Sequence, residues 1–62
     1  MIDSASHTQI IAQLQTVILQ TMDLIDQFEA HGLQHSADYT ELWRILHTAQ
    51  QTQRQHIAAL RG

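Results

Sequence analysis

The sequence predicts an all-α protein, namely a two-helix antiparallel hairpin that we expect to dimerise into a four-helix bundle. Its 62 residues include no proline, so nothing in the chain forbids long helices. Apolar residues recur at helical spacing on both sides of one break, the glycine-containing segment 31–36. A chain shorter than about 70–80 residues seldom buries a sufficient core by itself, and without disulfides or a metal it usually oligomerises.

The first helix is predicted over about residues 6–31. Ser6 is a good N-cap with Gln9 at capping-box spacing, and Asp3 or Ser4 could serve instead. Three mainly apolar columns follow a heptad frame: Ile11, Ile18 and Ile25; Leu14, Thr21 and Phe28; Ile10, Val17 and Leu24. Together they form a stripe wider than about 100°, which is enough to contact two neighbouring helices.

The break is predicted to form a loop over about residues 32–37. Gly32 can adopt the left-handed conformation that closes a Schellman motif, which would fold Leu33 back on Phe28. A connection this short places the two helices antiparallel. Residues 1–62 are therefore expected to form a single domain.

The second helix is predicted over about residues 38–60, beginning after Ser36 or Asp38. Ala49 is the only apolar residue between His47 and His56, and three polar residues there occupy positions that the pattern assigns to the core: Gln50, Gln53 and His56. Two explanations remain open at this point. The glutamines could fix the register of a bundle from inside it, or the segment could be a polar surface for a ligand or partner.

Charges separate toward the two ends of the predicted hairpin. The loop end carries five carboxylates: Asp23, Asp26, Glu29, Asp38 and Glu41. The other end carries Arg54 and Arg61, with His7 and His56. An antiparallel dimer would place the acidic end of each chain beside the basic end of the other, which selects orientation more than it supplies affinity.

The residues expected at the interface between copies lie on the apolar columns and in the polar segment. They are Ile11, Leu14, Ile18, Ile25, Leu46, Ala49, Gln50, Gln53 and Ile57.

Several functional classes are disfavoured by composition. The chain has no cysteine, so it forms no disulfide. Its formal net charge is −3 and it has three Lys and Arg in total, so binding to a phosphate backbone is not expected. His31 and His35 have the four-residue spacing of metal ligands, but Gly32 interrupts the helix that would align them. We therefore predict no metal site, no cofactor site and no catalytic residues. Short apolar runs predict no membrane span, and the N-terminus has no signal-peptide pattern, which favours a cytoplasmic protein.

The sequence thus predicts a non-enzymatic protein–protein interaction module, such as a small adaptor, regulator or assembly factor. Its expected partners are a second copy of the chain and an unidentified protein. The alternative is a nucleic-acid-binding regulator of the helical-hairpin-dimer type, and a third possibility is a metal-binding helical bundle.

Overall fold

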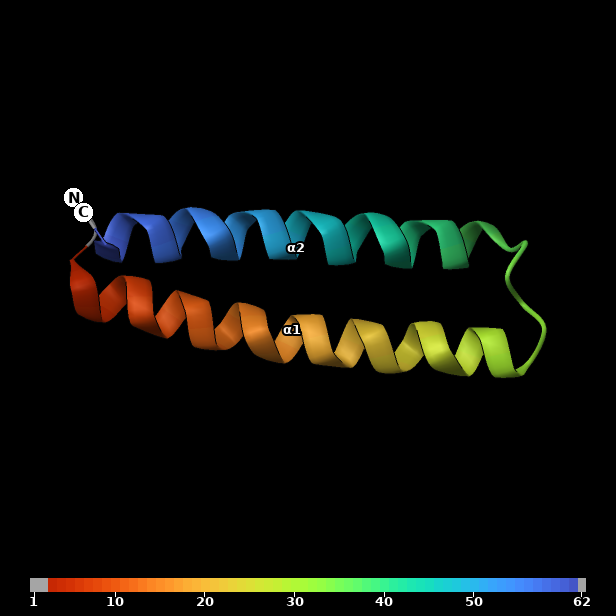
Figure 1. Ribbon diagram of the computed structural model, residues 1–62. Coiled ribbons are helices and arrows are strands. Elements are labelled where there is room, and N and C mark those ends of the chain that lie inside the picture. The colour runs from red at the N-terminus through yellow and green to blue at the C-terminus, as the bar shows by residue number, and fades with distance from the viewer. Residues whose placement is uncertain (1–2, 62) are drawn as a thin grey trace.

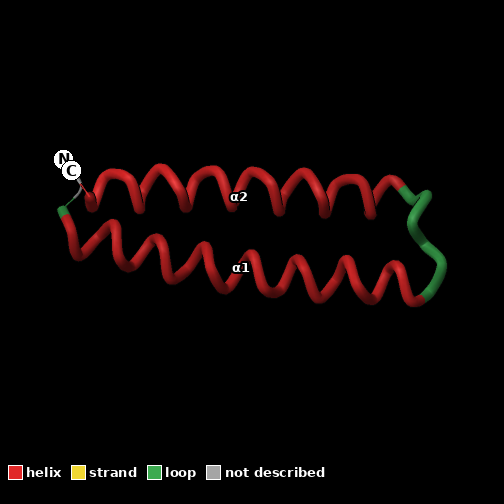
Figure 2. The backbone as a smooth tube through the Cα atoms, viewed as in Figure 1, coloured by secondary structure: helices red, strands yellow, loops and turns green. Residues whose placement is uncertain are grey.

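The computed structural model describes residues 3–61, and these form an antiparallel hairpin of two α-helices. Helix α1 spans Ser4–Ala30 and helix α2 spans Ala37–Arg61. The helices lie side by side along their whole length, with the connecting loop at one end and the start of α1 and the end of α2 at the other (Figures 1 and 2). The hairpin measures 43 × 15 × 14 Å. The predicted all-helical hairpin is confirmed, and its assembly into a four-helix bundle stays a prediction.

Helix α1 starts at Ser4 because its N-cap is Asp3, one of the alternatives to Ser6 that the sequence allowed. The Asp3 carboxylate accepts a hydrogen bond from the backbone N–H of Ser6 at 2.8 Å. This bond to the charged form is the main reason that the pKa of Asp3 is lowered. Ser6 therefore lies inside the first turn as a donor to the cap.

The predicted Schellman motif at the end of α1 is confirmed. Gly32 has a φ of +70°, in the left-handed region that glycine adopts without strain. The backbone N–H of Leu33 donates to the carbonyl of Phe28 at 2.8 Å, and that of Gly32 donates to the carbonyl of Glu29 at 3.1 Å. These two bonds satisfy carbonyls that the end of a helix would otherwise leave exposed.

Helix α2 begins directly after Ser36, which is one of the two starts that the sequence allowed. The Ser36 hydroxyl accepts a hydrogen bond from the backbone N–H of Tyr39 at 3.2 Å, as an N-cap does. Asp38 lies in the first turn, where a carboxylate is favoured by the helix dipole. Glu41 forms an ion pair with Arg44.

The core lies between the two helices of one chain. Among the described residues, the buried apolar side chains are Ile18, Ile25, Leu46 and Ala49. Leu14, Tyr39 and Leu42 are partly buried and pack against them. Thr21 is also buried, and its hydroxyl donates to the carbonyl of Val17 at 2.7 Å, so the polar group is satisfied within its own helix.

Polar contacts set the register of the helices toward the chain ends. The amide nitrogen of Gln53 lies 3.3 Å from the carbonyl oxygen of Ile11, to which it donates. Leu46 lies seven residues before Gln53, and Ile18 lies seven residues after Ile11. Because the helices are antiparallel, this register places Leu46 at about the level of Ile18. Both are core residues, and they mark the middle level of the hairpin.

Candidate interaction site

Four residues of the interface expected between copies are already used by the fold of one chain. Ile18, Ile25, Leu46 and Ala49 are each 3–6 % exposed. Helix α2 covers the apolar stripe of α1, so these side chains have almost no surface left for a second copy. Sequence periodicity showed that the stripe would be buried, but not that the chain itself would cover most of it.

The other five residues of that expected interface are half-buried. They are Ile11, Leu14, Gln50, Gln53 and Ile57. Gln53 donates from its amide nitrogen both to the Ile11 carbonyl and to the side-chain oxygen of Gln15, the latter at 3.0 Å, so it joins α2 to α1. Gln50, three residues earlier, instead lines an open groove on one side of the hairpin. The two core-position glutamines therefore have different surroundings, which spacing alone could not distinguish.

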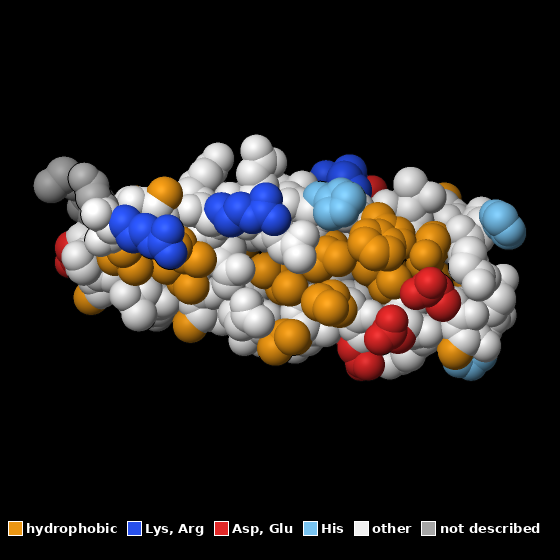
Figure 3. Space-filling model, in the orientation of Figure 1, with side chains coloured by type: hydrophobic (Ala, Val, Ile, Leu, Met, Phe, Trp, Pro, Cys, Tyr) orange, Lys and Arg blue, Asp and Glu red, His pale blue; other side chains and the backbone are white. Residues whose placement is uncertain are grey.

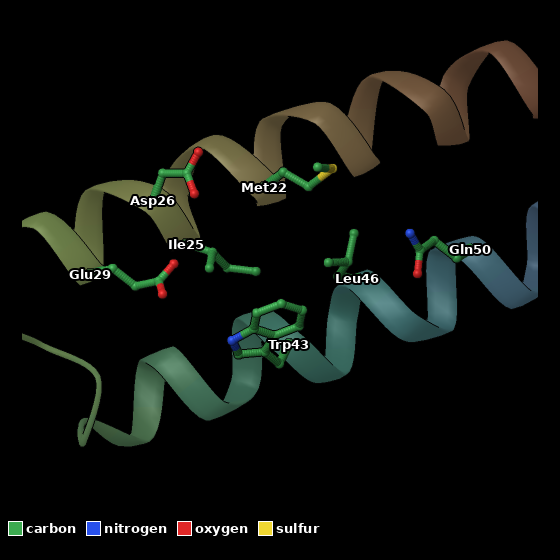
Figure 4. Close-up of a pocket in the computed structure, with 7 residues that line it drawn as sticks. All are labelled: Met22, Ile25, Asp26, Glu29, Trp43, Leu46 and Gln50. Atoms are coloured by element: carbon green, nitrogen blue, oxygen red, sulfur yellow. The ribbon is translucent and has the colours of Figure 1, made fainter.

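The groove lies between α1 and α2 and has a volume of about 280 Å³ (Figure 4). Its lining residues are Met22, Ile25, Asp26, Glu29, Trp43, Leu46 and Gln50. Ile25 and Leu46 in this lining are buried, whereas Met22 and Trp43 are 46 % and 38 % exposed. The groove therefore combines core residues with exposed apolar ones and is open to solvent. We call this side of the hairpin the groove side.

Aromatic neighbours hold the indole of Trp43 along the surface of α2. The ring of Tyr39 meets it edge-on with centroids 6.4 Å apart. The ring of His47 lies 5.8 Å from it, one turn further along the helix. Such pairs orient aromatic rings, and Trp is a residue type that often anchors protein–protein interfaces.

Charged side chains lie at the two ends of the groove side. Asp26 and Glu29 line the groove toward the loop. Arg54 follows Gln50 by four residues and so lies on the same side of α2, and Arg61 follows Arg54 by seven. On the face in Figure 3, most visible Lys or Arg side chains lie in the half away from the loop, most visible Asp or Glu side chains lie in the half near it, and hydrophobic side chains lie among and between them.

Arg44, the remaining arginine, is paired within its own helix. Within residues 3–61 the only ion pair is the one between Arg44 and Glu41, and the hydrogen bond from the guanidinium lowers the pKa of the Glu41 carboxyl. Both side chains are exposed on α2, so the pair contributes little to stability.

The opposite side of the hairpin is also apolar. Leu24 follows Met22 by two residues, which is about 200° around an α-helix and so faces away from the groove. Val17 lies two turns before Leu24 on the same side. These two side chains are 42 % and 40 % exposed. We call this side of the hairpin the opposite side. The groove side and the opposite side thus both carry exposed apolar residues.

Across residues 3–61 there is no group of three or more His, Cys, Asp or Glu side chains placed to hold a metal ion. His31, one of the spaced histidines, contacts the carbonyl of Gln27 through Nδ1 at 2.8 Å. In the part of the chain that the structure covers, neither helix combines the length and the hydropathy that crossing a membrane requires.

The groove was not found from the sequence. Met22 lies outside the three columns that the heptad frame selects, and Trp43 is not among the residues that the sequence places at an interface. The sequence feature that could have indicated the groove is the presence of large apolar residues on both flanks of the stripe. Comparison with known protein families, with curated proteins and with solved structures gave no match to this chain.

Proposed function

We propose that the protein is a non-enzymatic protein–protein interaction module that acts as a homo-oligomeric helical bundle. The observation that carries this proposal is the amount of apolar surface that the hairpin leaves exposed. Seven large hydrophobic residues of the described chain are exposed: Val17, Leu19, Met22, Leu24, Leu33, Trp43 and Leu60. Exposed apolar clusters on a small domain are typical of surfaces that bind another protein.

The size of the core supports the same proposal. The four buried apolar side chains of residues 3–61 are few to offset the conformational entropy that these residues lose on folding. Covering Met22, Trp43, Val17 or Leu24 with a second hairpin would bury further apolar area, at about 25 cal/mol per Å². Self-association is therefore expected to stabilise the fold as well as to build the bundle.

Apolar residues on two sides allow the module to connect two neighbours. One side would be covered by a second copy, and the other would remain available to a different protein. A module of this kind suits an adaptor, regulator or assembly factor, because it joins copies of itself to a partner without performing chemistry.

The test is the oligomeric state of the purified chain as a function of concentration. Light scattering after size exclusion should show a dimer or larger assembly at micromolar concentration, and circular dichroism should show helicity falling on dilution as the assembly dissociates. A fully helical monomer that is stable at micromolar concentration would overturn the proposal.

A further inference from the structure

We propose that the groove side of the hairpin binds the groove side of a second copy in antiparallel orientation, with Asp26 of each chain at the level of Arg54 of the other. This inference rests on the proposed function, because it presupposes self-association. It adds which surface is used, how the two copies are oriented and which charges select that orientation.

The positions of the two charges along the hairpin match. Leu46 and Ile18 belong to one core cluster, and the register indicated by the Gln53–Ile11 hydrogen bond puts them at about the same level, near the middle of the hairpin. Asp26 comes eight residues after Ile18, toward the loop, and Arg54 comes eight residues after Leu46, toward the chain ends. At a rise of about 1.5 Å per residue, each charge is about 12 Å from the middle level, in opposite directions.

A two-fold axis through the middle level, perpendicular to the length of the hairpin, therefore brings Asp26 of one copy to the level of Arg54 of the other. The operation sets the two charges at one level twice, as an isologous interface requires. Because it stacks α1 on α1 and α2 on α2, the two charges attract each other diagonally across the interface. The two residues lie on the same side, because Asp26 lines the groove and Arg54 is one helical turn beyond Gln50, which also lines it. Parallel docking would instead place the two copies of Asp26 at the same level, which is unfavourable.

The apolar centre of the groove side fits the same arrangement. Trp43 precedes Leu46 by three residues and Met22 follows Ile18 by four, so both lie on the loop side of the middle level. Gln50 follows Leu46 by four residues and lies on the other side of it. Antiparallel docking brings Trp43 and Met22 of each copy to the level of Gln50 of the other, so apolar side chains enter the groove and an amide lies near the indole N–H, which needs an acceptor when buried.

The groove side is large enough for a stable contact. A standard protein–protein interface buries about 800 Å² on each partner. That area is about one sixth of the 4643 Å² surface of the hairpin. The hairpin is a bar 43 Å long with a nearly square cross-section of 15 × 14 Å, so one of its four long sides carries about a quarter of that surface, which is enough. The opposite side, with Val17 and Leu24, provides apolar contact without this pair of charges, so it stays available to a different partner.

Two charge reversals test the orientation. Asp26→Arg leaves positive charges at both positions, and Arg54→Asp leaves negative charges at both, so each variant should form a weaker homodimer than the wild-type chain. Mixed in equal amounts, the two variants regain both attractive pairs. Native mass spectrometry should show the heterodimer as the main species, with an affinity at least about tenfold above that of either homodimer. Both side chains are exposed, so circular dichroism should show that each variant folds when associated.

Two matched substitutions test which side is used. Met22→Lys places a charge on the groove side and Leu24→Lys places one on the opposite side, at residues of similar exposure, 46 % and 42 %. Sedimentation should show that Met22→Lys weakens the dimer at least about tenfold and that Leu24→Lys does not. Dimers that depend on Leu24, or charge variants without preference for each other, overturn this inference while the proposed function stands. A wild-type chain that is monomeric and helical overturns both.

Discussion

Nδ1 of His7 lies 2.7 Å from Nδ1 of His56, across a separation of 49 residues. The ring centroids are 4.9 Å apart, so the two nitrogens face each other nearly in line. One imidazole must donate its Nδ1–H while the other accepts, because two donors or two acceptors would repel at this distance. This contact closes the hairpin at the end away from the loop.

His56→Ala is expected to loosen that end of the hairpin. Loss of one hydrogen bond lowers the unfolding free energy by about 0.5–1.5 kcal/mol. Amide hydrogen exchange should become faster in the first turns of α1 and the last turns of α2, and not near the loop. His47→Ala is the control, because His47 is exposed and contacts Trp43 near the middle of the hairpin. Uniform acceleration along both helices would contradict a local role for His56.

Gly32→Ala is expected to destabilise the turn through the backbone alone. A Cβ at this position would meet no atom within 4 Å, so no clash contributes. The left-handed φ of +70° remains unfavourable for alanine, at a cost of about 1–2 kcal/mol. Thermal unfolding followed by circular dichroism measures the loss. Gly32→Asn should lose less, because asparagine tolerates this conformation better than alanine does.

Ile18→Ala is expected to remove most of the helical signal. Ile18 is 5 % exposed at the middle of a small core, and truncating a buried isoleucine costs about 2–5 kcal/mol. Val17→Ala, at the neighbouring exposed position, should cost less than about 1 kcal/mol in the stability of the hairpin. Urea unfolding of the two variants at equal protein concentration measures the difference. Equal losses would mean that Val17 is as deeply buried in the assembly as Ile18.

The two core-position glutamines should respond differently to substitution by leucine. Gln53→Leu gives up hydrogen bonds to Ile11 and Gln15 but adds apolar contact between the helices, which should raise the stability of the hairpin by up to about 1 kcal/mol. Gln50→Leu changes the groove and should act on the association constant instead. Thermal unfolding and sedimentation of both variants separate the two effects. A stability gain confined to Gln50→Leu would reverse this assignment.

The N-cap of α1 predicts a loss of stability at acid pH. Its bond from Ser6 lowers the pKa of Asp3 in the folded chain, so the folded state binds this proton less tightly than the unfolded state does. The stabilisation is therefore complete above the unfolded value of about 3.9 and is lost as pH falls through the lower folded value.

Asp3→Asn keeps a capping side chain that does not titrate in this range. Its thermal midpoint should fall less than that of the wild type between about pH 5 and pH 2. Glu41→Gln controls for the other carboxyl with a lowered pKa, which Arg44 stabilises. Identical acid profiles for wild type and Asp3→Asn would show that the cap is not coupled to folding.

Local signals in the sequence predicted the hairpin well. Gly32 was recognised as the Schellman glycine because few other residues adopt a positive φ, and Ser36 was one of two proposed starts for α2. The sequence left the start of α1 open among Asp3, Ser4 and Ser6, because all three are good caps, and only the geometry shows that Asp3 accepts from Ser6.

The site was harder to predict, because the same apolar stripe can pack against a helix of its own chain or of another. Ile18, Ile25 and Leu46 were assigned to an interface between copies, yet they form the core of one chain. The contact between His7 and His56 depends on a register that is set by the whole hairpin. Helical periodicity assigns both residues to the same end without showing that they touch.

Helix α1 begins and helix α2 ends at the end of the hairpin opposite the loop (Figure 1). This arrangement determines how the fold resists a pulling force. A pull applied to Asp3 and Arg61 acts across the helices rather than along them. The load would fall first on the His7–His56 contact, then on Gln53, and only afterwards on the layer of Ile18 and Leu46. The contacts between the two helices would then break one level after another. This needs a lower force than breaking all of them at once by sliding one helix along the other.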